Sequence, residues 1–204
     1  MILETLVSTV DAAGHPNVAP MGITLADETI VLRPFRGAAT WRNLEATGCG
    51  VLHFTDNVLL FARCALASEV PPHRPAAVVR GIVLDDAAHW REFAVDASDL
   101  AGERATFRAR VVATGRRRDL LLFNRAQHAV VEATILATRV HLTGAGPVMA
   151  EIARLRPLVD KTGGTREREA FAFVEAAVVA LAAASAPVQA PAPAPAPVGD
   201  EGRP

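Results

Sequence analysis

The chain has 204 residues, a formal net charge of -1 and a hydrophobic content of 50%. This length is enough for one domain of ordinary size with an appendage, and for burial of a large part of the surface. The near-zero net charge provides no overall field that would recruit nucleic acid or an anionic membrane. Composition therefore predicts a globular protein with neither kind of partner.

The few cysteines and the apolar segments bear on the cellular compartment. Cys49 and Cys64 lie far apart without a C-x-x-C pattern, which predicts free thiols and not a disulfide framework or a zinc knuckle. Met1 to Thr5 lacks the basic region and long apolar core of a signal peptide. The apolar run 170–184 contains Glu175 and is shorter than the roughly twenty residues of a membrane span. We expect a cytoplasmic protein that does not enter the membrane.

Short apolar or alternating stretches predict β-strands along the first half of the chain. Turn residues such as those of Asp11 to Gly14 join neighbouring strands into an antiparallel meander. The predicted strands are 4–10, 17–25, 29–34, 50–55, 88–95 and 105–113. Short strands with few helices between them predict a small barrel, and Pro71 to Pro75 predicts a stiff loop.

A short helix is predicted from Trp41 to Thr47, with Thr40 as its N-cap and Gly48 at its end. Its first-turn N–H groups and the positive end of its dipole can meet an anion. Arg33 and Arg36 lie just upstream of small residues that let a ligand approach the backbone. The segment therefore predicts a phosphate-binding turn. The alternative is an ordinary capped helix beside solvated arginines.

Two longer helical segments flank the later strands. One runs from Asn57 to Ala67, and the other from Asn124 to Thr138. The second carries a polar stripe that includes Arg125, His128 and Glu132. This stripe is either a salt-bridge ladder on a solvated surface or the border of a binding site.

Two helices are predicted at the C-terminal end, the first from Gly146 through Asp160 with an interruption near Pro157. The second runs from Arg166 to about Ser185 with Thr165 as its N-cap. Together they form a helical hairpin whose apolar residues need either the barrel or a second subunit to cover them.

The last residues have a composition of their own. Alternating Ala and Pro from Ala186 to Val198 cannot form a packed core and predict a disordered tail. The expected units are a barrel domain at 1–143, the hairpin at 144–185 and the tail at 186–204.

Several motifs carry a resemblance to a known family. They are the runs Asn17 to Gly22 (N-V-A-P-M-G), Leu32 to Leu44 (L-R-P-F-R-G-A-A-T-W-R-N-L), Val51 to Phe61 (V-L-H-F-T-D-N-V-L-L-F) and Phe123 to Ala133 (F-N-R-A-Q-H-A-V-V-E-A). They resemble the FMN-binding split-barrel superfamily of flavin reductases, in which an N-x-A-P-x-S/G strand passes the isoalloxazine ring and a later segment holds the ribityl phosphate. The match is closer to a subfamily of unassigned function that occurs alongside tetrahydromethanopterin-linked one-carbon metabolism.

The resemblance implies a fold, a cofactor and a set of contacts. The fold is mainly β with α, an antiparallel split β-barrel of the FMN-binding type plus a C-terminal helical hairpin, and the state is a homodimer with FMN near the subunit interface. His128 is the candidate catalytic residue, as a donor of a proton or of a hydrogen bond. The expected cofactor contacts are Asn17, Ala19, Pro20, Met21, Gly22, Arg33, Pro34, Phe35, Arg36, Thr40, Asn43, His53, Phe54, Thr55, Asn124 and Arg125.

The function implied is that of an FMN-dependent oxidoreductase acting on a small molecule, with a pterin of one-carbon metabolism as the candidate substrate. The alternative is a non-catalytic flavin-binding carrier, sensor or assembly protein. The chain departs from ordinary flavin reductases at Gly22, where serine is usual, and at Phe35 to Gly37, where a lysine-bearing segment is usual. No G-x-G-x-x-G follows a strand and the histidines are scattered, so neither a Rossmann nicotinamide site nor a metal site is expected.

Overall fold

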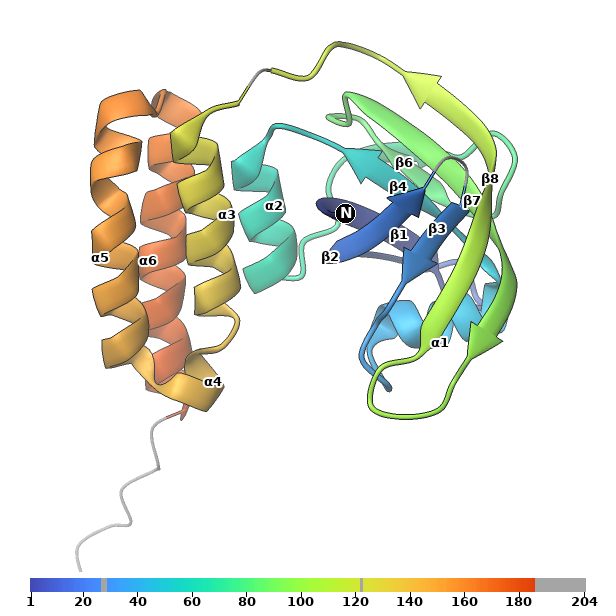
Figure 1. The fold of residues 1–204 in the computed structure, drawn as a ribbon, viewed down its shortest axis with the longest axis horizontal. Helices are drawn as coiled ribbons and strands as arrows, with labels where there is room; N and C mark the ends of the chain where they lie inside the picture. Colours follow the sequence, from blue (N-terminus) through green and yellow to red (C-terminus); the bar gives the residue numbers. More distant parts are fainter. Residues whose placement is uncertain (27–28, 122, 186–204) are drawn as a thin grey trace, which may run out of the picture.

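The computed structural model describes residues 1–26, 29–121 and 123–185. A β-barrel forms one half of the molecule and a group of helices forms the other half (Figure 1). The chain passes between the two halves after the fourth barrel strand and returns to the barrel. It leaves again through the connection that follows the last strand.

The barrel is closed and antiparallel throughout. Its strands are β1 (Ile2–Val10), β2 (Pro16–Ala26), β3 (Thr29–Leu32), β4 (Cys49–Phe54), β7 (His89–Asp99) and β8 (Thr106–Arg116). Their order is β1-β2-β3-β8-β7-β4, and β4 closes the barrel by pairing with β1. The predicted antiparallel barrel with C-terminal helices is confirmed.

Alternation along the strands fills the barrel interior. Phe107 and Ala109 of β8 both point inward and are buried, as their spacing by two residues requires. Ile23 and Leu52 from other strands complete the same core. Neighbouring residues of opposite parity, such as Arg108, are exposed.

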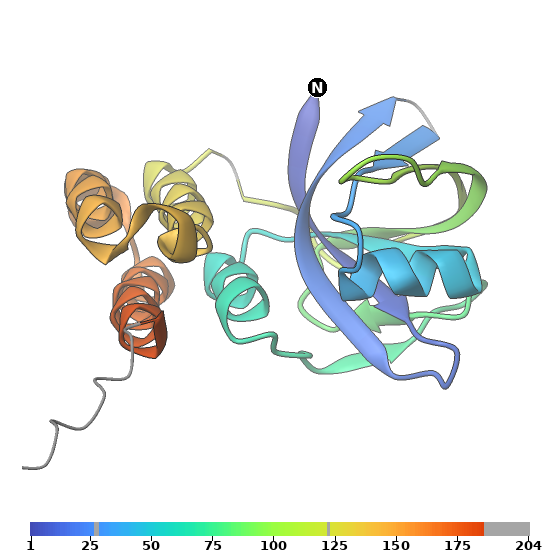
Figure 2. The ribbon, with the colours of Figure 1, turned by 90° about the horizontal axis from the view of Figure 1, so that it is seen from below.

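α1 (Ala39–Thr47) packs on one end of the barrel, with Leu44 in the barrel core (Figure 2). The prediction that Thr40 caps this helix is wrong, because the N-cap is Ala38. The preceding loop turns tightly, and the Ala38 carbonyl already accepts from the Arg42 N–H at 3.0 Å, so Thr40 lies within the first turn. Gly48 ends the helix as predicted, with a left-handed φ of 63° that glycine adopts without strain.

The helical half consists of α2 (Val58–Leu66), α3 (Arg125–Ala137), the short α4 (Val140–Thr143), α5 (Ala145–Thr162) and α6 (Thr165–Ser185). α2 lies between the barrel and the other long helices in both views (Figures 1 and 2). One face of α2 places Val58 and Ala62 in the helical core, and another places Phe61 and Cys64 against the barrel. α2 therefore joins the two cores.

α5 and α6 form the predicted hairpin, and α2 and α3 of the same chain cover it. Ile152 and Phe171 are buried in the core that these helices share. The predicted interruption at Pro157 is wrong, since α5 continues through it. Pro157 has no N–H to donate to the Ala153 carbonyl. Because Ala153 and Pro157 are both exposed, water can donate to that carbonyl instead.

The predicted N-cap of the last helix is also wrong. The Gly164 carbonyl accepts from the Arg168 N–H at 3.2 Å, and the Glu167 carboxylate accepts from the Gly164 N–H at 2.9 Å. This pattern places Gly164 at the N-cap position of α6 and makes Thr165 the first residue of the helix.

A small hairpin of β5 (His73–Pro75) and β6 (Ile82–Leu84) stands beside the barrel, where the sequence predicted a loop at Pro71 to Pro75. Its turn is held by the buried carboxylate of Glu92, which accepts from the N–H groups of residues 77–79 at 2.9, 2.7 and 3.0 Å. Burial alone would raise the pKa of Glu92, but these hydrogen bonds outweigh it and lower the pKa.

Within the described part of the chain, no helix combines the length and apolar character that crossing a membrane requires. The predicted tail at 186–204 lies outside the described residues.

Candidate functional site

A cavity of about 410 Å³ opens between the β1–β2 edge of the barrel and the start of α1. We call it the first cavity, and it is within the size range of small-molecule sites. Its lining consists of Ile2, Glu4, Ala19, Pro20, Met21, Gly22, Arg33, Pro34, Phe35, Ala38, Thr40 and Arg104. Four separate segments of the barrel domain, namely β1, β2, the segment after β3 and the β7–β8 turn, thus converge on it with the first turn of α1.

The α1 end of the first cavity presents hydrogen-bond donors. No side chain caps the helix, so its first-turn N–H groups are available to a ligand and carry the positive end of the dipole. Asn17 of β2 donates its side-chain amide to Thr40 Oγ1 at 3.1 Å. This bond uses a lone pair of the hydroxyl and leaves its proton free to donate.

Two arginines flank the same end. Arg33 comes from the segment after β3, and Arg104 comes from the β7–β8 turn; both side chains are exposed. The Arg104 guanidinium lies 3.8 Å from the centre of the Phe35 ring, which fixes it by a cation–π contact. The Arg36 N–H donates to the Glu103 carbonyl at 2.9 Å and ties the two loops together. The arrangement is suited to a phosphate group.

The strand side of the first cavity has little room above the backbone. A Cβ on Gly22 would lie 3.0 Å from Ile2 Cγ2 and 3.2 Å from Glu4 Oε1. The Ile2 and Glu4 side chains already lie where a side chain at position 22 would extend, so a residue larger than glycine would have to displace them.

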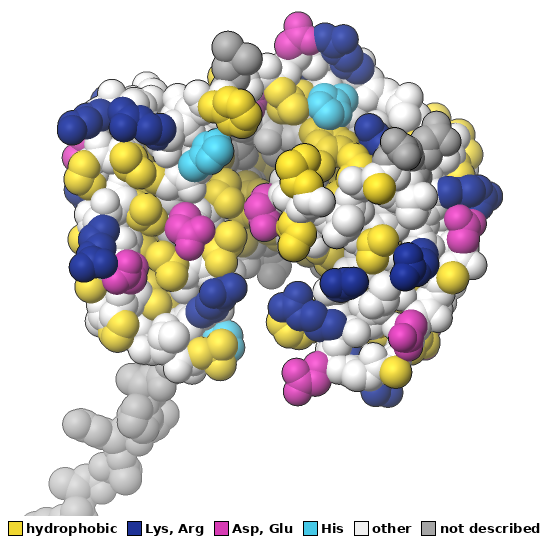
Figure 3. All heavy atoms as spheres, in the orientation of Figure 1, with side chains coloured by type: hydrophobic (Ala, Val, Ile, Leu, Met, Phe, Trp, Pro, Cys, Tyr) yellow, Lys and Arg dark blue, Asp and Glu magenta, His cyan; other side chains and the backbone are white. Residues whose placement is uncertain are grey.

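A second cavity, of about 580 Å³, lies between the barrel and the helical half. Glu4, Thr55 and Asp56 line it from the barrel side, and His128 and Glu132 line it from α3. The face in Figure 3 shows a hollow between the two halves with hydrophobic side chains on both sides. Glu4 belongs to both cavities, so the two cavities adjoin.

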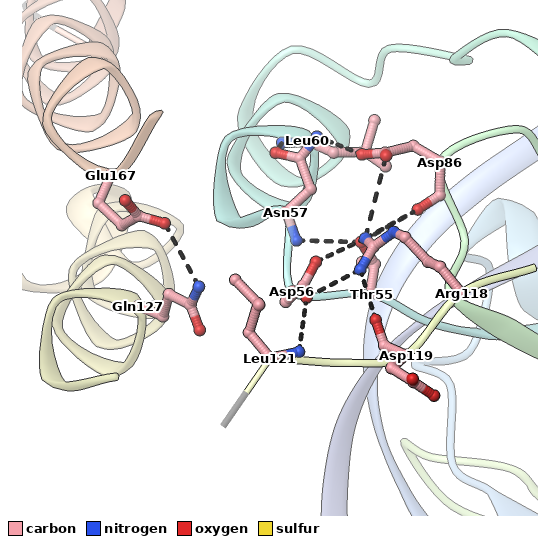
Figure 4. A network of polar contacts seen from close by, with 10 residues as sticks. All are labelled: Thr55, Asp56, Asn57, Leu60, Asp86, Arg118, Asp119, Leu121, Gln127 and Glu167. Carbon is pink, nitrogen blue, oxygen red and sulfur yellow. Dashed lines mark hydrogen bonds and ion pairs between the residues drawn. The ribbon is translucent and has the colours of Figure 1, made fainter. Parts of the chain in front are cut away.

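A polar network beside the second cavity holds the connection between β8 and α3 (Figure 4). Arg118 donates to both carboxylate oxygens of Asp56, at 2.9 and 2.5 Å, and the Leu121 N–H donates to the same carboxylate at 2.9 Å. Burial would raise the pKa of Asp56, but these hydrogen bonds outweigh it and lower the pKa. Asn57, the N-cap of α2, joins the network by donating to Asp86.

The structure brings eight of the sixteen predicted cofactor contacts to the first cavity: Ala19, Pro20, Met21, Gly22, Arg33, Pro34, Phe35 and Thr40. Asn17 adjoins them through Thr40. Thr55 and the predicted catalytic residue His128 line the second cavity instead.

The other predicted contacts lie elsewhere. Asn43 is buried and donates to Thr9 Oγ1 at 3.0 Å, and the fully buried His53 has its Nδ1 3.2 Å from the Leu6 carbonyl oxygen. Phe54 stacks on His89 at 4.5 Å between ring centres. Asn124 caps α3, accepting from two of its N–H groups and donating to the Thr162 carbonyl. Arg36 and Arg125 are exposed and line neither cavity.

Sequence reasoning missed Arg104 and Glu4. Arg104 is distant in sequence from Phe35, and the pairing of their two loops brings it to the first cavity. The sequence predicted Glu4 only as the first residue of a strand. The alternation of that strand predicts which residues are buried but not that Glu4 lines two cavities. No group of three or more potential metal-ligating side chains converges within residues 1–26, 29–121 and 123–185.

The barrel has a fold that is also found in solved structures of flavin-binding proteins. Flavoredoxin from Methanosarcina acetivorans superposes with a TM-score of 0.51 at 13% identity, over 59% of this chain and 72% of that chain. An FMN-binding protein from Thermus thermophilus superposes with a TM-score of 0.50 at 18% identity, over 56% of this chain and 71% of that chain. At these identities the likeness shows the fold.

The family is shown by closer matches. Residues 3–118 match the N-terminal domain and residues 124–179 match the second domain of a family described as protein of unknown function (DUF447). The chain therefore belongs to the DUF447 family. An FMN-bound protein of this family from Methanosarcina mazei superposes with a TM-score of 0.76 at 28% identity, over 86% of this chain and 94% of that chain. No curated protein matches the sequence.

Proposed function

We propose that this protein binds FMN in the first cavity and acts as an FMN-dependent oxidoreductase on a small molecule. The observation that carries the proposal is the convergence of an uncapped helix start, the Thr40 hydroxyl and two arginines at one end of this cavity. A ligand with a phosphate tail suits these donors. The FMN-bound family member from Methanosarcina mazei supports the choice of FMN.

The residues present fit the two ends of FMN. Arg33, Arg104 and the first-turn N–H groups of α1 hold the phosphate, because they supply positive charge and directed donors. Thr40 donates its free hydroxyl proton to a phosphate or ribityl oxygen. The β2 backbone from Ala19 to Gly22, which lines the first cavity, lies along the ring edge.

FMN, when bound, supplies hydride or electron transfer, and the protein supplies orientation and access. The substrate occupies the second cavity, which adjoins the first at Glu4. His128 faces this cavity and donates a proton or a hydrogen bond to the substrate. Its ring packs edge-on against Phe123 at 6.2 Å between centres, which helps to orient it.

Three finer assignments accompany this proposal. The resemblance to relatives that occur with tetrahydromethanopterin-linked one-carbon metabolism favours a pterin as the substrate. We assign a cytoplasmic location, in keeping with two free cysteines.

We also assign a homodimer, because Phe123 is 97% exposed and Leu121 is 69% exposed beside the second cavity, and a partner subunit would cover them. Light scattering on the FMN-loaded protein measures this state, and a monomer would reject it.

Turnover separates an enzyme from a flavin carrier. We expect the FMN-loaded protein to oxidise NADH or NADPH in the presence of an acceptor from a panel of pterins, nitroaromatics and free flavins. Full FMN occupancy without turnover of any acceptor would instead support the non-catalytic role. A protein that binds no FMN would reject both roles.

A further inference from the structure

The second cavity has walls suited to a flat apolar molecule. Its apolar side chains come from three helices of the helical half, and Figure 3 shows a hollow between that half and the barrel. They are Val58 of α2, Ala129, Val131 and Ile135 of α3, and Leu155 and Leu158 of α5. Burial of an aromatic or heteroaromatic ring against such walls is favourable in proportion to the apolar area covered.

The charges in this cavity are of one sign. Glu4 and Glu132 line it, and neither carboxylate has a side-chain partner among residues 1–26, 29–121 and 123–185. The third carboxylate, Asp56, is already satisfied by Arg118 and the Leu121 N–H. Among the described residues, none that lines this cavity is arginine or lysine, whereas Arg33 and Arg104 line the first cavity. The two cavities thus differ in the charge of the ligand that they favour.

We propose that the second cavity binds a flat, largely apolar substrate that carries an amidine-like, N–H-donating head group, with Glu132 as the acceptor. A carboxylate accepts paired N–H donors from such a group in charge-assisted hydrogen bonds, and it repels an anionic head group of the same shape. This inference rests on the proposed flavoprotein function, because the shared residue Glu4 places the substrate beside the FMN site.

The test uses three small aromatic probes of nearly equal shape: benzamidine, benzamide and benzoate. Titration into the FMN-loaded protein, followed by calorimetry and by the change in flavin absorbance, gives an affinity for each probe. We expect benzamidine to bind about tenfold more tightly than benzamide, in line with one added hydrogen bond to a charged group, and benzoate to bind most weakly. The flavin absorbance changes when the probe lies beside FMN.

Glu132→Gln tests the acceptor, and Glu151→Gln is its matched control. Glu151 also lies on a helix, but its exposed side chain pairs with Arg154 at 3.4 Å and does not line the cavity. We expect Glu132→Gln to weaken benzamidine by about tenfold and to leave benzamide nearly unchanged, while Glu151→Gln changes neither affinity. Both variants should retain FMN, because neither residue lines the first cavity.

Three results would overturn the inference: benzoate binding as tightly as benzamidine, equal loss in both variants, or no binding of any probe to FMN-loaded protein. Failure of the proposed function gives a different result. If the protein binds no FMN, the same titrations are made on the flavin-free protein. A benzamidine preference that Glu132→Gln removes would then support the cavity and reject the flavin site.

Discussion

Arg33 and Arg104 provide the sharpest test of how the first cavity holds an anion. They come from separate loops and reach the same end of the cavity as Thr40. Replacing either by alanine removes a positive charge and its N–H donors without disturbing the barrel core, because both side chains are exposed. Arg108→Ala is the control, since Arg108 is exposed on β8 and lines neither cavity.

The expected effect follows from the exposure of the two arginines. A hydrogen bond to a charged group contributes about 1.5 to 3 kcal/mol, and water screens an exposed guanidinium, so we take the lower value for each. Each single variant should then weaken FMN binding about tenfold, and the double variant about a hundredfold if the losses add.

Quenching of FMN fluorescence on titration with the protein measures these affinities. The difference between wild type and the double variant should shrink at high salt, because the Debye length falls to about 3 Å at 1 M ionic strength. The reasoning is refuted if Arg33→Ala and Arg104→Ala both bind FMN as tightly as Arg108→Ala does, at low salt.

Three further predictions concern the second cavity, the connection between β8 and α3, and the buried histidine of β4. His128→Ala should lower turnover by about a hundredfold while FMN binding stays normal, and unchanged turnover would return His128 to a packing role. Asp56→Asn should lower the free energy of unfolding in urea at pH 7 by about 1 to 2 kcal/mol, because the side chain that contacts Arg118 loses its negative charge. In wild type the same contribution is lost as the pH falls below the ordinary aspartate pKa of 3.8, so a difference between the two proteins that persists in acid would contradict this prediction. Burial lowers the pKa of His53 from 6.5 to about 4, so between these pH values the unfolded chain binds a proton that the folded chain does not, and about 3 kcal/mol of stability should be lost as the pH falls across this range. His53→Gln should remove this part of the pH dependence of the unfolding free energy, and His15→Gln should not. The same pH dependence in wild type and both variants would count against the prediction.

The barrel was predictable because its signals are local. Strand alternation gave all six strands of the barrel within a few residues, and Gly48 marked the end of α1. The helix starts were less predictable, because Thr40 and Thr165 are good capping residues by type. The tight turn at Ala38 and the Glu167 contact to Gly164 decide the actual starts. The β5–β6 hairpin was missed because its turn depends on Glu92, which is distant in sequence.

The site was predictable to the extent that it is built from contiguous motifs. The motif on β2 and the segment from Arg33 to Thr40 were both identified, and the residues Ala19 to Gly22, Arg33 to Phe35, Ala38 and Thr40 from them line the first cavity. Arg104 could not be found in this way, because it reaches the cavity through the pairing of two loops that are distant in sequence. The role of Asp56 also depends on Arg118, which lies 62 positions further along the chain.

The identity and amount of flavin in the purified protein test the central claim most directly. Denaturation followed by chromatography of the supernatant releases any bound cofactor without assuming a substrate or an electron donor. We predict a yellow protein that releases equimolar FMN, either as purified or after incubation with added FMN. A colourless protein that takes up no FMN under these conditions would contradict the account.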